Sequence, residues 1–434
     1  MATPKGNSGY AVFGDKSAEF YKDPIAFVTK RIDEHGARIF QSRILNKPTV
    51  FVCTVKGVRD LLVEQHHHFE MGYKAFMYQL YGDNIMFSDA VDAARLHGVI
   101  HSLFGNGGLP DVNQLIDRLI ERHLSHLDSD ATDQSCPSTS IYNVFKRFAT
   151  ELSLAIFLGL DAEKYPELVE ECIELTTTHW HGIISVPLSV KLPSWSSSWS
   201  SGYSKAIEAK DQLLKIINSR ISNADNDNIL RHIKEAGFDD TKELAQHLLC
   251  FVSALVPKAL SSLLTSFTLM TAGPEKEAMR IRASDNSQYL HKVLLEVQRL
   301  VPPFIGGRRL TRKDSLIDGY KVPEGTAVIY ITYAAHRDPS VFKKPDKFRP
   351  ERWIDGEQKS EDVLSCFGGG PRSCVGVGLM KNSMMRVCSY LLDHYEWRLP
   401  GGQDLTYKWL PVSRPKDPPY VVFCSKGEEE TEID

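Results

Sequence analysis

The sequence predicts a mainly helical fold with small β-sheets, an α+β arrangement, and three observations support this prediction. From about residue 111 to 272, apolar residues recur three and four positions apart, the spacing of one helix face. Two β-branched runs between residues 38 and 55 alternate apolar and polar residues, as strands do. A second strand-like run covers residues 320–331. We therefore expect a helical body with small sheets towards both ends.

The elements can be justified in order along the chain. Asp23-Pro24 predicts a helix start, because proline is favoured in the first helical turn. Asn46-Lys47 separates the two β-branched runs and predicts a hairpin turn. Pro323 and Gly325 predict a turn in the later strand-like run, and a last helix is expected from Gly376 to His394. We expect one domain over 1–434, with a β-rich part at about 23–65, a helical body at about 90–300 and a C-terminal part at about 301–425.

Composition restricts the functional classes. The 434 residues include 51 basic and 55 acidic side chains, a net charge of −4, which does not indicate a nucleic-acid partner. The length exceeds the usual domain size of roughly 50–250 residues, so a large fold around a central group such as a cofactor is one explanation. Eight cysteines without a CxxC pair indicate a reducing compartment.

No segment predicts a membrane anchor. The first 22 residues contain no apolar run of the ~20 residues needed to span a membrane, and the apolar stretch 248–270 contains a proline and a lysine. We expect that stretch to be a buried helix, and the protein to be intracellular, either cytoplasmic or peripheral on a membrane. The segment Trp180–Tyr203, with Trp195 and Trp199, predicts either an exposed connection or a membrane-surface contact.

The segment Phe367-Gly-Gly-Gly-Pro-Arg-Ser-Cys-Val-Gly376 carries the most specific chemistry. Three glycines, beginning at Gly368, let the backbone lie close against a flat ligand. Cys374 precedes a helix, where backbone N–H groups and the helix dipole stabilise a thiolate. Arg372 supplies a cation for the thiolate or for a carboxylate of the ligand. Taken alone, the segment could be a glycine-rich loop around a buried cysteine.

The segment resembles the motif Phe-x-x-Gly-x-Arg-x-Cys-x-Gly of the cytochrome P450 family, matched at Phe367, Gly370, Arg372, Cys374 and Gly376. The resemblance implies the P450 fold, with haem b buried between the family's helix I and the cysteine loop with helix L. It also implies that the Cys374 thiolate is the metal ligand, whose electron donation favours O–O cleavage. The similarity extends from about residue 23 to 422.

Further motifs of the family occur upstream in the expected order. Glu296-Val-Gln-Arg299 resembles its Glu-x-x-Arg motif, and Arg352 resembles the second arginine of its Glu–Arg–Arg ion network. One carboxylate between two guanidinium groups can be bound bidentately and fix the loops behind the haem. The resemblance also implies that Arg308 and, less specifically, His97 bind the haem propionates.

The family's acid–threonine pair on helix I, which supplies protons for oxygen activation, is missing. Counting back from Ser266 places Ala259-Leu260 at the pair, and a shift by one makes Ser261 the alcohol with Leu260 in place of the acid. Pro257 predicts a kink that costs roughly 3 kcal/mol in a regular helix. Lys258, next along the chain, either holds an anionic substrate or a water, or points outward. Lys258, Leu260 and Ser261 are therefore the candidate distal catalytic residues.

An apolar pocket is expected above the haem. The segment 71–87 is rich in aromatic residues and methionine, which suits either an adaptable cavity or plain core. The substrate should then be small and largely apolar. The candidate pocket residues are Phe76, Phe87, Ala254, Val256, Pro257 and Ile305.

Three functions remain open at this point. The first, favoured by the frequency of this activity in the family, is a monooxygenase that receives electrons from a reductase. Lys381 and Arg386, after Cys374, are candidate contacts for that reductase, or ordinary solvated helix charges. The second is an enzyme that consumes a peroxide or rearranges a hydroperoxide without a reductase, as the missing acid–threonine pair suggests. The third is a haem-binding sensor or carrier without turnover.

Overall fold

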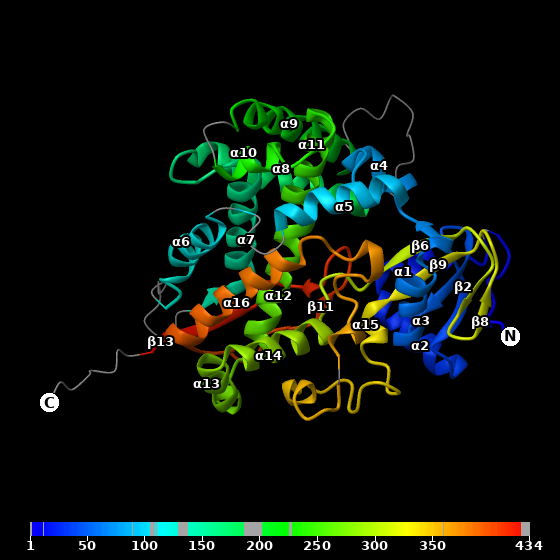
Figure 1. The fold of residues 1–434 in the computed structure, drawn as a ribbon. Coiled ribbons are helices and arrows are strands. Elements are labelled where there is room, and N and C mark those ends of the chain that lie inside the picture. The colour runs from blue at the N-terminus through cyan, green and yellow to red at the C-terminus, as the bar shows by residue number, and fades with distance from the viewer. Residues whose placement is uncertain are drawn as a thin grey trace, which may run out of the picture.

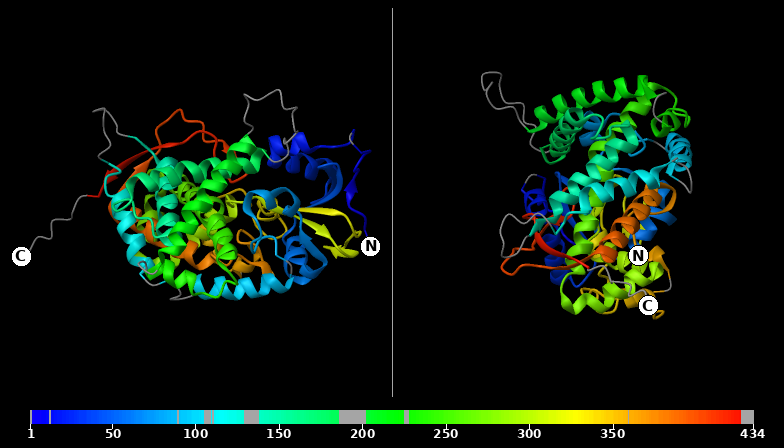
Figure 2. Two further views of the ribbon diagram at one scale, coloured as in Figure 1. Left: turned by 90° about the horizontal axis from the view of Figure 1, so that it is seen from above. Right: turned by 90° about the vertical axis from the view of Figure 1, so that its left-hand side faces the viewer.

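The structure is a computed structural model, and it places a helical part beside a part built from sheets (Figure 1). The view from above shows the same side-by-side arrangement (Figure 2, left). The observed architecture is the predicted one, mainly helical with small sheets. The described residues are 2–11, 13–88, 90–104, 109, 111–128, 138–185, 202–224, 228–358 and 360–426.

The helices account for most of the described chain. The α-helices are α1 (Ser17–Lys22), α2 (Pro24–His35), α3 (Val55–Arg59), α4 (Lys74–Tyr81), α5 (Ala90–Phe104), α6 (Val112–Leu124), α7 (Ile141–Leu158), α8 (Pro166–Ser185), α9 (Gly202–Ser222), α10 (Asn228–Lys234), α11 (Thr241–Cys250), α12 (Val256–Met270), α13 (Glu277–Asp285), α14 (Ser287–Leu300), α15 (Thr332–Ala335) and α16 (Val377–His394). Two π-helices are η1 (Asp60–Glu64) and η5 (Phe251–Leu255), and the 3-10 helices are η2 (His66–His68), η6 (Pro274–Lys276), η7 (Pro350–Trp353), η8 (Glu361–Val363) and η9 (Gly370–Arg372).

The strands form one larger sheet and three small ones. They are β1 (Lys5–Gly6), β2 (Ile39–Ile44), β3 (Lys47–Val52), β4 (Phe69–Met71), β5 (Thr139–Ser140), β6 (Gly306–Thr311), β7 (Ser315–Ile317), β8 (Tyr320–Val322), β9 (Ala327–Ile331), β10 (Tyr395–Arg398), β11 (Tyr407–Lys408), β12 (Arg414–Pro415) and β13 (Tyr420–Ser425). The six-stranded sheet has the order β1-β2-β3-β9-β6-β4. The small sheets have the orders β10-β13-β5, β11-β12 and β7-β8.

The predicted N-terminal helix and hairpin are both present. The Asp23 side chain accepts hydrogen bonds from the N–H groups of Ile25 and Ala26, and proline occupies the first turn of α2. Strands β2 and β3 pair antiparallel. Their turn is centred on Leu45 and Asn46, at φ values of 51° and 56°, one residue before the predicted position. Positive φ at both central residues is the geometry of a type I′ hairpin turn.

The later strand-like run also turns where predicted, since Gly325 has a φ of +76°. However, the two strands that it joins belong to different sheets. Strand β8 pairs with β7, whereas β9 lies between β3 and β6, with every residue buried. Alternation along a strand predicts which face is buried but not which strand becomes the partner.

The predicted buried helix is the centre of the helical part. Helices α11, η5 and α12 form one continuous helix, Thr241–Met270, and α12 lies between α7 and α16 (Figure 1). Among the described residues, this is the one helix long and apolar enough to cross a membrane. Its most apolar 18-residue stretch is 100% buried inside the protein, as in the core helix of a globular fold.

The tryptophan-rich connection differs in part from the prediction. Trp180 belongs to α8 and is only 7% exposed, because it packs against the side chains of α4, α9 and η5. It is therefore not part of an exposed segment. Trp195 and Trp199 lie outside the described residues.

Candidate active site

The cysteine loop is held in a tight conformation against η1. Cys374 N–H donates to the Phe367 carbonyl oxygen at 2.7 Å, which closes the loop. Gly370 has a φ of +63°, and a Cβ there would approach the carbonyl oxygen of Leu62 to 2.4 Å. A side chain at this position would therefore force the loop away from η1. Helix α16 begins three residues after Cys374, as predicted.

The Cys374 sulfur lies in a recess. The residue is accessible to solvent, yet burial raises the pKa of its thiol while the backbone N–H of Gly376 opposes this shift. Both observations hold for a sulfur at the bottom of a deep opening surrounded by protein. A Cβ at Gly376 would lie 3.9 Å from Sγ, so glycine keeps the space beside the sulfur open. A flat ligand fits such a recess.

Two of the three candidate propionate ligands lie close together. Arg372 donates from Nη2 to the Ser88 carbonyl oxygen at 2.6 Å. Burial, and next the charge of Arg372, lower the pKa of His97 on α5. The two side chains therefore lie close enough to interact electrostatically. Both side chains are half-buried, and a guanidinium beside an imidazole N–H donor fits a ligand with carboxylates, such as haem.

Arg308, the third candidate, has different neighbours. It is 2% exposed, and its Nη1 donates to the Gly72 carbonyl oxygen at 3.3 Å. Burial raises the pKa of Tyr73, and the charge of Arg308 opposes this shift, so the phenol lies near the guanidinium. No sequence motif indicated Tyr73, because only the β4–β6 pairing brings it to Arg308.

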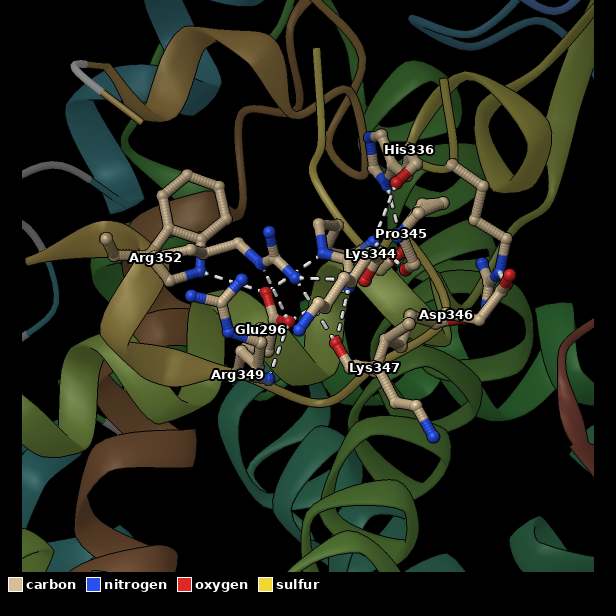
Figure 3. Close-up of polar contacts among 12 residues, drawn as sticks. Glu296, His336, Lys344, Pro345, Asp346, Lys347, Arg349 and Arg352 are labelled. Carbon is tan, nitrogen blue, oxygen red and sulfur yellow. Dashed lines mark hydrogen bonds and ion pairs between the residues drawn. The ribbon is translucent and has the colours of Figure 1, made fainter. Parts of the chain in front are cut away.

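The predicted ion network is present and fully buried (Figure 3). Glu296 accepts from Nε and Nη2 of Arg299, both at 2.9 Å, and from Nε of Arg352 at 3.0 Å. The backbone N–H of Arg349 and the indole N–H of Trp353 also donate to it, at 2.9 and 3.1 Å. The carboxylate is thus satisfied by five donors, which offsets the cost of its burial.

The network continues to the segment that precedes the cysteine loop. Arg299 Nη1 donates to the His336 carbonyl oxygen at 2.8 Å, and the Nε2 atom of His336 accepts from the Ser365 N–H at 2.9 Å. Burial, and next the charge of Arg299, lower the pKa of His336 to about 3, so the ring is neutral and Nε2 is free to accept. The Cys366 thiol donates to the Gln298 carbonyl oxygen. Helix α14 therefore fixes the chain two residues before Phe367.

The predicted kink at Pro257 takes the form of a π-helix. A proline ring clashes with the carbonyl four residues earlier, here Ser253, and η5 is the π-helix that contains Ser253. A π turn contains one extra residue, so it opens the helix at the position where proline needs room. The strain is absorbed without ending the helix.

The predicted distal residues Leu260 and Ser261 follow the π turn and lie in α12 with Ser266, so their spacing from Ser266 is that of a regular α-helix. Leu260 is 1% exposed and belongs to the main helical core rather than to the cluster that contains Phe87 and Ala254. The Ser261 hydroxyl lies 2.8 Å from the Pro257 carbonyl oxygen and 3.2 Å from that of Lys258, and it can donate to either. A distal role for the two residues stays a prediction.

A buried apolar cluster from five segments contains two of the predicted pocket residues, Phe87 and Ala254, and we call it the wall cluster. Ile305 is buried, but its neighbour Phe304 is the residue that packs against this cluster. Pro257 is buried outside it, and the side chains of Phe76 and Val256 lie outside the described residues. The buried members are Leu80, Tyr81, Phe87, Trp180, Ala206, Cys250, Ala254 and Val412.

A buried polar group that sequence reasoning missed adjoins this cluster. His179 contacts the Ser253 Oγ through Nδ1 and the Leu80 carbonyl oxygen through Nε2, both at 2.9 Å. Burial lowers the pKa of His179 to about 4, so the neutral ring donates from Nε2 and accepts from Ser253. The Tyr81 ring centroid lies 4.7 Å from that of His179. Ser253, one of several serines in an apolar helix, gave no specific signal in the sequence.

Lys258 is buried, with 4% of its surface exposed, so it does not point outward. Burial, and next the charge of Lys146, lower the pKa of Lys258 to about 7. The burial of Lys258 excludes the outward orientation, which was one of the two that the sequence left open.

The two candidate reductase contacts both have carboxylate neighbours. Lys381 lies 3.7 Å from Glu361, and Arg386 lies 2.7 Å from Asp117. They are partly exposed members of ion pairs, which reduces the positive charge that they present.

Comparison with known proteins decides the family. The family model "Cytochrome P450" matches residues 4–275 and 269–423. The chain belongs to the cytochrome P450 family. It is therefore an oxidoreductase with haem as cofactor and a cysteine thiolate as iron ligand, and Cys374 holds that position in the motif. A haem sensor or carrier without turnover is not supported.

Relatives resemble this P450 over nearly its whole length. A putative cytochrome P450 120 from Synechocystis sp. is 26% identical over 96% of both chains. Abscisic acid 8'-hydroxylase 4 from Arabidopsis thaliana is 24% identical over 94% of this chain and 90% of its own. The solved structure of retinoic acid bound cyanobacterial CYP120A1 has a TM-score of 0.82 at 24% identity, covering 98% of this chain and 99% of that one, and it shares the fold.

Proposed function

We propose that this P450 is a monooxygenase that hydroxylates a small, largely apolar organic substrate, using dioxygen and electrons from a reductase. The observation that carries the proposal is the wall cluster on helix Cys250–Ala254, opposite the cysteine loop in the family's fold. Its aromatic and aliphatic side chains would bury an apolar molecule and exclude water. The names of two relatives support this substrate class, since one hydroxylates abscisic acid and one has bound retinoic acid.

The reaction balances as a hydroxylation. When bound, the haem supplies oxygen activation, with the thiolate favouring O–O cleavage. One oxygen atom enters a C–H bond of the substrate and the other leaves as water, with two electrons from the reductase and two protons. Phe87 and Ala254 would orient the substrate, and His97, Arg308 and Arg372 would hold the propionates. The Ser253 hydroxyl, hydrogen-bonded to His179 and one residue before Ala254 of the wall cluster, is a buried polar group that could pass a proton.

A second candidate function rests on one observation. The stretch Phe251–Ser261 contains neither an acidic residue nor a threonine, so the usual proton donors are missing. An enzyme that uses a peroxide, or rearranges a hydroperoxide, has no need of them. In that case no reductase would bind near Lys381 and Arg386.

The test supplies both oxidants to the purified holoenzyme with retinoic and abscisic acids as substrates. A surrogate reductase with oxygen-18 gas should give a hydroxylated product that contains the label, and the Cys374→Ser variant should give none. Hydrogen peroxide or an organic hydroperoxide alone should only bleach the haem slowly. Product from peroxide without reductase, and none with it, would overturn the monooxygenase proposal in favour of the second function.

A further inference from the structure

Five basic side chains from five elements lie close to one another, and we call them the cation cluster. They are Lys146, His181, Lys258, Lys408 and Arg414, from α7, α8, α12, β11 and β12. We propose that the cation cluster binds a carboxylate of the substrate, so that the enzyme acts on a lipophilic acid. This inference rests on the proposed function and adds the anchoring group.

Hydrogen bonds bring β11 and β12 against α12. The Ser262 hydroxyl donates to the Ser413 carbonyl oxygen at 2.6 Å, and the Ser266 and Tyr407 hydroxyls lie 3.1 Å apart. Lys408 directly follows Tyr407, and Arg414 directly follows Ser413. Lys408 and Arg414 face each other across the two antiparallel strands. Residues that face each other in this way have Cβ atoms about 5 Å apart, and like charges there destabilise a sheet.

Helix α7 supplies the opposite side. Lys146 lies one turn after Tyr142, so the two share a helix face. Burial raises the pKa of Tyr142, while the charge of Arg414 and a hydrogen bond with Ser261 oppose this shift. Tyr142 therefore lies between β12 and α12, and its phenol adds a hydrogen-bond donor to the group.

Among the described residues, three members of the cation cluster, Lys146, Lys258 and Arg414, have no carboxylate partner. Burial and then the charges of Lys258, Lys146, Arg414 and Lys408 lower the pKa of His181. Burial and Arg414 likewise lower the pKa of Lys146. Over the described ranges, no ion pair or hydrogen bond joins the side chains of Lys146, Lys258 or Arg414 to an acidic residue. Charges gathered without a counter-ion cost stability, and an anion would offset that cost.

Three members of the cation cluster are neighbours of wall-cluster residues along the chain. Ala254 of the wall cluster lies one helical turn before Lys258, Trp180 directly precedes His181, and Val412 lies two residues before Arg414. His181 and Lys408 are exposed, whereas Lys258 is buried. The cation cluster therefore includes both exposed side chains and a buried one on the helix that carries Ala254. A molecule with an apolar body and one anionic end matches this arrangement, and the exposed cations would attract it.

The test compares a lipophilic acid with its uncharged ester on the holoenzyme. Retinoic acid and methyl retinoate have the same apolar body, and their binding is followed by the haem absorption change and by calorimetry. The wild type should bind the acid about tenfold or more tightly than the ester, the effect expected for charge-assisted hydrogen bonds. Lys258→Met and Arg414→Met should each lose this preference with the ester affinity unchanged. Lys258→Arg should retain it.

Lys242→Met is the matched control, because Lys242 is exposed on the same long helix and far from the wall cluster. It should keep the preference for the acid. Calorimetry at pH 8 in two buffers of different ionisation enthalpy should show proton uptake when the acid binds to the wild type, and none with Lys258→Met.

Two outcomes would overturn the inference: equal affinities for acid and ester in the wild type, or an acid preference that survives both Met variants. Failure of the proposed function is a separate result. In that case the acid would bind through Lys258 and Arg414, but no labelled product would form with reductase and dioxygen.

Discussion

At the scale of single residues, Lys258 is a side chain whose burial destabilises the folded state. It is 4% exposed on a mainly apolar helix, and the charge of another lysine, Lys146, adds to burial in lowering its pKa. A buried ammonium group without a counter-ion destabilises the folded state. The residue therefore either only destabilises the fold or also binds an anion. The pH dependence of the free energy of unfolding measures how much it destabilises the fold.

We expect Lys258→Met to stabilise the ligand-free holoenzyme by roughly 1–4 kcal/mol near pH 7. The pKa of Lys258 is about 7 when folded and 10.5 in the unfolded chain, so between these values the unfolded state binds more protons. Stability of the wild type should therefore rise from pH 7 to 10.5, and the difference from Lys258→Met should shrink. Urea unfolding at several pH values checks this. A constant difference across that range would contradict the burial argument.

At the scale of elements, the Glu296 network joins α14, η7 and the segment before the cysteine loop. Every charged group in it is fully buried, so its members depend on one another. Glu296→Gln removes the carboxylate shared by Arg299 and Arg352 and leaves only the Arg352–Glu357 ion pair among the described contacts, so it should cost about 3–5 kcal/mol. Thermal unfolding and the haem absorption spectrum measure this, because the cysteine loop should loosen as well.

Glu34→Gln is the matched control for that change. Glu34 is half-exposed and lies 3.8 Å from Lys30 on the surface of α2, where a pair contributes about 0–1 kcal/mol. A similar small loss in both variants would mean that the buried network does not hold the loop.

Among these elements, those fixed by local residues could be predicted from the sequence, and those fixed by distant contacts could not. Helix α2, the β2–β3 turn and the start of α16 follow from local residues: an N-cap with proline, two residues at positive φ, and a glycine-rich loop. The ion network followed from the resemblance to the motifs of the P450 family, because the spacing of Glu296 and Arg299 alone also fits a solvated pair. The π-helix did not follow, since Pro257 predicts a disruption of the helix but not its form. The neighbours of Lys258, His179 and Tyr73 come from segments 70 or more residues away, which periodicity cannot pair.

At the scale of the whole molecule, the recess around Cys374 collects segments from both parts of the fold. The cysteine loop packs on η1 from the sheet part, and Arg372 bonds to Ser88 between α4 and α5 of the helical part. A ligand bound there contacts elements that are far apart in sequence. Ligand binding to the folded state alone stabilises all of them together.

We therefore expect Cys374→Ser to lose the thiolate-type absorption band of the reduced carbon monoxide complex and part of the thermal stability. Ligand binding at 100 to 1,000 times its dissociation constant contributes about 3–4 kcal/mol, so weaker haem binding should lower the unfolding temperature of the whole chain. Cys424→Ser is the control, because Cys424 is exposed on β13 and should leave both properties unchanged. Differential scanning calorimetry with parallel spectra checks the expectation. A Cys374→Ser protein with the original band would mean that another residue ligates the iron, and unchanged stability after haem loss would mean that the two parts hold together without it.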